Sequence, residues 1–212
     1  EAITDYAPGK TCWCATLKAD TQSVFRDHAG WDGRARNVPT ARMAHRQPLI
    51  GTAGWSIRSE CREAFPAKGS HLERYAARFN AVEINSSFYR PHRRATYERW
   101  AGTVGQDFRF SVKLPRTVSH ARHADGHEAE ISRFAAEVAG LGDKLGIVLI
   151  QFPPSLAYDA ARASRLFAAI RARLSCRLAC EPRHASWFGD DADALLDQLH
   201  IARVAADPAL MT

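Results

Sequence analysis

The sequence has no run of apolar residues long enough to cross a bilayer. A membrane-spanning helix needs about 20 consecutive, mainly apolar residues, and no such run occurs among the 212 residues. The N-terminus has no basic segment followed by an apolar core, so we expect no secretory signal peptide. The first residue is Glu1 rather than Met, and we expect that the start is processed or incomplete.

Cysteine is scarce, and its arrangement argues against a disulfide framework. The five cysteines are an odd number with no repeating spacing, which favours a reducing compartment and a cytoplasmic location. Cys12 and Cys14, with His28 and His45, do not have a usual zinc-binding spacing, so incidental cysteines are the favoured interpretation.

Sequence signatures for nucleotides and metals are also missing. The chain has no P-loop, no dinucleotide fingerprint, no HExxH and no paired CxxC. The formal charge of +6 favours anionic partners such as phosphates, nucleic acid or acidic metabolites, although only weakly.

The chain divides into two parts. Residues 1–48 have no sustained period of 2 or 3.6, and we interpret them as poorly structured or foreign to the following domain. Residues 49–212 form the second part, in which short apolar runs alternate with amphipathic stretches. The expected strands are 49–55, 81–87, 107–113, 146–152, 177–183 and 201–206. The expected helices are 70–79, 93–104, 127–142, 159–174 and 190–200, with Ser70 and Asp159 as N-caps.

This alternation predicts an α/β fold in which crossover helices join parallel strands. An open doubly wound sheet would have strands that are apolar on both faces. Polar and apolar residues instead alternate in 81–87, 107–113 and 177–183, with Val82 opposing Glu83, for example. We therefore predict a TIM-barrel-like fold that is incomplete, with about six of the eight βα units of a closed barrel.

Polar side chains gather at the carboxyl ends of the expected strands, where barrel enzymes hold their active sites. The predicted catalytic residues are Glu83, Lys113, Glu181 and His184. The predicted ligand-binding residues are Trp55, Asn85, Ser86, Tyr89, Arg90, His120, Gln151, Arg183 and Trp187. Because an arginine can bind a phosphate or carboxylate with two nitrogens, while lysine adds a point charge, the set predicts a small anionic ligand.

Two alternatives stay open for parts of this set. Glu83 and Lys113 could be a structural ion pair inside the barrel, and His120 could be a surface residue. Glu83, Glu181, His184 and Asp207 could hold a divalent metal, but the abundant cations nearby argue against it, so we expect no cofactor.

Five separated motifs resemble the YecE-like family, domain of unknown function 72 (DUF72), in their order and spacing. The motifs are IGTAGWS, YAARFNAVEINSSFYR, DFRFSVKLPRTVSH, LGDKLGIVLIQFPPS and ACEPRHASWF, and the resemblance covers residues 49–208. It implies a TIM-barrel-like fold and no particular activity. The family's signature polar positions match Glu83, Asn85, Ser86, Tyr89, Arg90, Lys113, His120, Gln151, Glu181, Arg183, His184 and Trp187.

The resemblance also implies a copy that is truncated at its C-terminus. The family usually continues past the sixth strand, whereas this chain ends at ADPALMT. A missing end would leave an open sheet edge, so we expect marginal stability or self-association.

Three functions follow as hypotheses. The first is an enzyme that acts on a phosphorylated or carboxylated, sugar-like substrate. In it, Glu83 or Glu181 would serve as general acid or base, and His184 as a proton shuttle, while Lys113 and Arg183 neutralise negative charge. The second is a nucleic-acid binding or processing protein, and the third is a non-catalytic remnant. Whether the chain is an enzyme is left open.

Overall fold

A computed structural model of the chain describes residues 48–121 and 126–206. Within them, five parallel strands form one sheet whose strand order follows the chain order. The strands are β1 (Ala81–Ile84), β2 (Arg109–Lys113), β3 (Leu145–Gln151), β4 (Arg177–Glu181) and β5 (Ala202–Arg203). Residues 1–47 lie outside the described residues. They include Cys12 and Cys14 and all but the last residue of the segment that was interpreted as poorly structured.

Helices connect the strands, as the alternating pattern predicts. They are α1 (His71–Ala76), α2 (Arg94–Thr103), α3 (Arg116–Ser119), α4 (Glu128–Val138), α5 (Ala160–Arg171) and α6 (Asp190–Gln198). Short 3₁₀ helices cover Ser59–Ala64, Ser86–Phe88, Ala139–Lys144 and Ala185–Phe188. Among the described residues, no helix combines the length and the apolar character that crossing a membrane requires.

Both predicted N-caps are confirmed. Ser70 and Glu73 form a capping box, in which the Ser70 N–H donates to Glu73 Oε2 over 2.6 Å. Asp159 Oδ1 accepts a hydrogen bond of 2.8 Å from the Arg162 N–H. The predicted helix 127–142 was too long, because Gly142 adopts a positive φ of 53° and the chain tightens to 3₁₀ geometry from Ala139.

The predicted strand 49–55 is wrong as a regular strand. In the described chain only an isolated bridge joins Ala53 to Glu83. Strand pairing does not continue past Ala53 because Gly54 has a φ of +79°, which an extended chain does not adopt. The segment still lies along β1, since the Ala81 and Glu83 N–H groups donate to Ile50 and Thr52 carbonyls over 3.2 and 3.0 Å.

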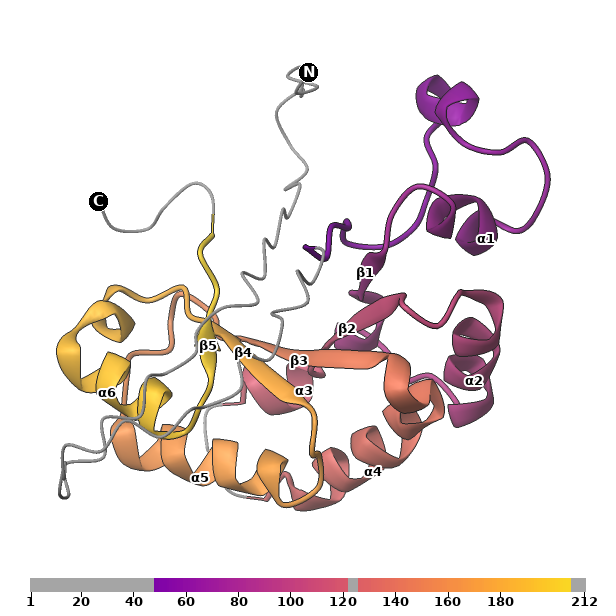
Figure 1. Cartoon of the computed structure of the whole chain (residues 1–212). Helices are drawn as coiled ribbons and strands as arrows, with labels where there is room; N and C mark the ends of the chain where they lie inside the picture. Colours follow the sequence, from indigo (N-terminus) through magenta and orange to yellow (C-terminus); the bar gives the residue numbers. More distant parts are fainter. Residues whose placement is uncertain (1–47, 122–125, 207–212) are drawn as a thin grey trace, which may run out of the picture.

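The two faces of the sheet differ in chemistry, as the alternation predicted. One face packs on the helices, and Figure 1 shows α4 and α5 lying along that side of the sheet. Its buried residues are Val82, Ile84, Phe110, Val112, Val148, Ile150, Leu178 and Cys180. The opposite face carries a small apolar cluster of Ile147, Leu149 and Ala179, and polar residues toward the strand ends. The sheet therefore presents its polar groups at the carboxyl ends of its strands, on the face away from the helix-packed core.

Candidate functional site

The polar residues at the carboxyl ends of β1 to β4 form what we call the strand-end cluster. It consists of Glu83, Lys113, Gln151, Glu181 and Arg183. The strand register places the first four on the same face, because Glu83 pairs with Ser111, Lys113 with Leu149, and Gln151 with Glu181. Parallel strands bring their carboxyl ends to one edge, so residues far apart in the sequence meet there.

Glu181 is the most constrained member of the cluster. It is 1% exposed, and its Oε1 accepts hydrogen bonds from Gln151 Nε2 over 2.7 Å and from Arg183 Nε over 2.6 Å. A second Arg183 nitrogen forms an ion pair with the same oxygen. Its other oxygen, Oε2, is buried and has no hydrogen-bond partner among the described residues. A buried acceptor without a partner is costly and uncommon, so this oxygen is a candidate for binding a ligand group, an ion or a water.

Burial shifts the pKa values of Glu83 and Lys113 more than the charge of either residue shifts the pKa of the other. Desolvation raises the pKa of Glu83, while the Lys113 charge acts in the opposite direction and Glu181 adds to the rise. Desolvation also lowers the pKa of Lys113, against the attraction of Glu83 and Glu181. The Lys113 ammonium lies 4.6 Å from the centroid of the Phe88 ring, a cation–π contact. Both groups are therefore held nearer to neutrality than exposed counterparts.

The raised pKa of Glu83 predicts a specific pH dependence of stability. Neutral Glu83 stabilises the fold fully below the ordinary pKa of 4.5, and this contribution is lost as the pH rises through the raised pKa. Glu83→Gln removes the titration. Its free energy of unfolding is expected to fall less than that of the parent between about pH 4 and about pH 8, measured by urea denaturation. A variant much less stable than the parent at neutral pH would show that pairing with Lys113 outweighs the cost of burial.

A groove of about 360 Å³ opens beside the cluster, and we call it the rim groove. Its lining residues are Phe88, Tyr89, Arg116, Thr117, His120 and Ala121. Phe88 connects it to the strand-end cluster, because the same ring contacts Lys113. The sequence predictions included Tyr89 and His120 but missed the other four. Arg116 could have been found, because it follows β2 as closely as other predicted residues follow their strands.

The predicted site residues that follow β1 lie outside the strand-end cluster and do not share one environment. The Oδ1 atom of Asn85 is buried without a hydrogen-bond partner among the described residues. Ser86 Oγ lies 2.8 Å from His92 Nε2, while Tyr89 and Arg90 are exposed. Ser87 is buried, and its hydroxyl lies 2.8 Å from the Ile84 carbonyl and 2.7 Å from the Lys113 carbonyl, so its single hydrogen is shared between them and ties this turn to β1 and β2.

Trp55, His184 and Trp187 are not brought into the strand-end cluster. Trp55 packs edge-on against Trp100 with ring centroids 5.0 Å apart. His184 Nδ1 accepts from the Ser186 N–H over 3.2 Å and so caps the 3₁₀ helix Ala185–Phe188.

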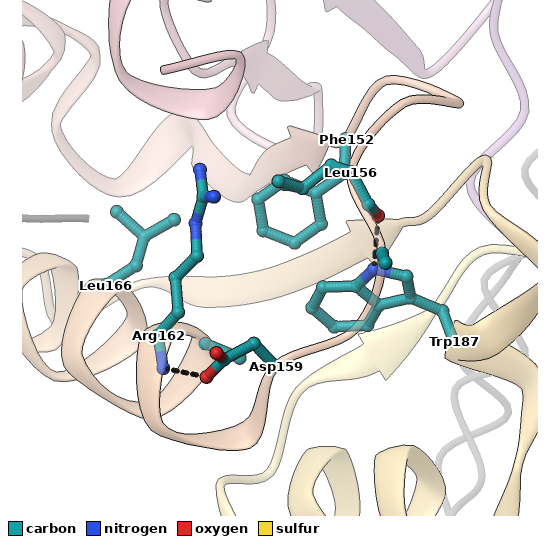
Figure 2. A pocket seen from close by; sticks show the side chains of 8 residues that line it. Phe152, Leu156, Asp159, Arg162, Leu166 and Trp187 are labelled. Carbon is teal, nitrogen blue, oxygen red and sulfur yellow. Dashed lines mark hydrogen bonds between the residues drawn. The ribbon is translucent and has the colours of Figure 1, made fainter. Parts of the chain in front are cut away.

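Trp187 is 2% exposed and lies in the core. It stacks on Phe152 at 4.8 Å, and its indole N–H donates to the Leu156 carbonyl over 3.0 Å (Figure 2). A cavity of only about 10 Å³ lies beside it, too small for a ligand. The contacts of Trp187 are therefore those of a packing residue.

The residues of the metal alternative do not gather into a centre in the part of the chain that the structure describes. There, no group of three or more His, Cys, Asp or Glu side chains is placed to hold a metal ion. Asp207, the fourth predicted ligand, lies outside the described residues.

Comparison with known families places this chain. The family described as "Protein of unknown function DUF72" matches residues 49–211, which is more than half of the sequence. The chain belongs to the DUF72 family. The resemblance read from the five motifs is thus confirmed.

Individual relatives match over shorter stretches. The chain is 34% identical to the UPF0759 protein YecE of Escherichia coli (strain K12) over 85 residues, which cover 39% of this chain and 30% of YecE. It is 29% identical to the UPF0759 protein YunF of Bacillus subtilis (strain 168) over 111 residues, which cover 50% of this chain and 39% of YunF. The matches therefore span 30% and 39% of the lengths of these two curated relatives.

Two crystal structures of DUF72 family proteins have a similar fold. One, from Enterococcus faecalis V583, has a TM-score of 0.62 at 20% identity and covers 73% of this chain and 59% of that chain. The other, from Thermotoga maritima MSB8, has a TM-score of 0.60 at 23% identity and covers 73% and 63%. At these identities the similarity supports the shared α/β fold and no particular activity.

Proposed function

We propose that this DUF72 chain carries part of a (β/α)₈ barrel and binds a small anionic, sugar-like ligand at the carboxyl ends of its strands. Parallel strands in sequential order and polar side chains on the face away from the helices support the barrel. The anion would be a phosphate or carboxylate, because Lys113 lies within electrostatic reach of Arg183, and Lys113 and Arg116 both act on His120.

One observation carries the proposal: the carboxylate of Glu181 is buried and fixed, and one of its oxygens has no hydrogen-bond partner among the described residues. Arg183 and Gln151 both use Oε1, so Oε2 is held in place for an incoming donor. A ligand hydroxyl would satisfy this acceptor, and hydroxyl groups are what a sugar-like molecule supplies. The buried Oδ1 of Asn85 offers a second such acceptor after β1.

The same geometry supports acid/base chemistry on the bound ligand. The pKa of Glu83 is raised by burial, which brings a carboxyl group closer to the range in which it can both give and take a proton. Lys113 beside it would neutralise negative charge that develops on the ligand. No metal is needed for these roles.

The role of Lys113 gives the direct test. Lys113→Met is expected to weaken the binding of ribose 5-phosphate about tenfold or more, because a charge-assisted contact to the phosphate is lost. Isothermal titration calorimetry would measure the affinity, with circular dichroism to verify folding. Arg94→Met is the matched control, because Arg94 is an exposed cation on α2 that pairs with Glu98. Equal weakening in both variants would mean that only general charge matters.

The nucleic-acid and remnant hypotheses lead to different results in binding experiments. Binding of a short single-stranded oligonucleotide that falls steeply with salt would support the nucleic-acid alternative. A remnant would bind none of these molecules. Self-association through an open sheet edge is a separate proposal, and light scattering would test it.

A further inference from the structure

We propose that the rim groove holds a flat, unsaturated ring that is attached to the anionic ligand of the strand-end cluster. The ligand class would then be a sugar phosphate, or a similar anion, that carries a planar ring. This inference rests on the proposed function and specifies its substrate.

Tyr89 is the main reason for the assignment. Tyr89 is 73% exposed and Ile50 is 47% exposed, and these two are the exposed large hydrophobic residues of the described chain. The Tyr89 ring packs nearly perpendicular to Phe88, at 87° with centroids 4.9 Å apart. The contact fixes the orientation of the ring while most of its surface stays open to solvent. An aromatic ring held in this way is suited to stacking on a flat partner.

The groove offers a second ring and a cation. His120 also packs against Phe88, with centroids 5.0 Å apart, and its Nδ1 lies 3.1 Å from Ser119 Oγ. Burial lowers the pKa of His120, and the charges of Arg116 and Lys113 lower it further, so the imidazole is neutral at neutral pH. With Nδ1 engaged, Nε2, which has no hydrogen-bond partner among the described residues, can bind a polar atom of the ligand ring. The Arg116 guanidinium is exposed and can stack on the ring or bind its anionic group.

The size and position of the groove fit an attached ring rather than a separate ligand. A volume of about 360 Å³ lies at the lower end of the usual range for small-molecule sites. Phe88 contributes one surface to the groove and receives Lys113 at 4.6 Å. A ring beside Tyr89 and an anionic group beside Lys113 would therefore be neighbours within one molecule.

Two probes test the inference, one with a planar base at C1′ of the sugar and one with a hydroxyl group there. Adenosine 5′-monophosphate and ribose 5-phosphate share the sugar and the phosphate, and calorimetry would give both affinities for the chain. We expect the parent to bind adenosine 5′-monophosphate at least about tenfold more tightly. Tyr89→Ala should remove most of this preference and leave ribose 5-phosphate within about twofold, whereas Tyr89→Phe should keep it, since stacking needs the ring and not the hydroxyl.

The outcomes separate this inference from the proposed function. If ribose 5-phosphate binds and loses affinity in Lys113→Met, but adenosine 5′-monophosphate gains nothing from its base, the ring site is overturned and the anion site stands. A preference for adenosine 5′-monophosphate that survives in Tyr89→Ala also overturns the ring site. If neither probe binds the parent, both proposals fall.

Discussion

Replacing Arg183 with methionine is expected to destabilise the chain by about 3 kcal/mol, one of the largest effects of any single change in the site. The substitution removes two contacts from Glu181, whose side chain is only 1% exposed, while the Arg183 side chain is itself 23% exposed. A buried carboxylate that loses its hydrogen-bonded cation is costly, because the removed contacts offset the cost of taking the charge out of water. Gln151 still donates to Glu181, which keeps the loss near the lower end of the usual range. Urea denaturation at neutral pH would measure the difference.

A double variant identifies the cause of this loss. Glu181→Gln together with Arg183→Met removes both charges, so it is expected to be more stable than Arg183→Met alone. Arg94→Met serves as a surface control and should change the free energy of unfolding by less than about 1 kcal/mol, because both members of its ion pair are exposed. If the double variant is no more stable than the single one, packing of the arginine stem rather than charge accounts for the loss.

Gly51→Ala is expected to separate residues 50–54 from β1 and to lower the free energy of unfolding by about 3 kcal/mol. A Cβ at position 51 would lie 2.0 Å from the Ala81 carbonyl oxygen, which is backbone and cannot turn away. The segment would have to move, with loss of the three backbone hydrogen bonds that Ile50, Thr52 and Gly54 form with β1. Each such bond contributes on the order of 1 kcal/mol. Loss of amide-exchange protection at Glu83, together with urea denaturation, would measure the effect.

The same substitution elsewhere in the chain provides the control. Gly102 lies in α2, and a Cβ there would meet nothing within 4 Å. Gly102→Ala should stabilise the chain by about 0.5 kcal/mol, because alanine loses less backbone entropy in a helix than glycine does. Opposite signs at the two positions would establish the close approach at Gly51. Similar small effects at both would mean that the segment is not held against β1.

Local patterns in the sequence predicted most of the fold, because they depend on neighbours along the chain. The N-caps at Ser70 and Asp159 and the apolar alternation of β1 and β2 were correct for this reason. Two of the errors lie where glycine geometry decides the outcome. Gly54 ends the extended segment before β1, and Gly142 lies beyond the end of α4, in positive-φ conformations that periodicity does not reveal.

In the candidate site, too, the sequence predicted some features and only the structure showed others. The position of Glu181 at a strand end was readable from the sequence, but its partners were not, because Gln151 and Arg183 reach it through strand pairing and a turn. Trp187 carried the same local signal as Arg183, yet it points into the core and stacks on Phe152. The direction of a side chain after a strand depends on the turn that follows, and periodicity says nothing about that turn.

By itself, the sequence determined the α/β class, the DUF72 family and the edge of the sheet at which polar residues gather, because these follow from alternation and motif order. Only the tertiary structure decided which of those residues meet. It joined Glu181 to Gln151 and Arg183, left one buried carboxylate oxygen without a partner in the described residues, and built the rim groove from Phe88, Tyr89 and Arg116. Such contacts join residues far apart in the chain, and their distances are set by packing rather than by sequence spacing.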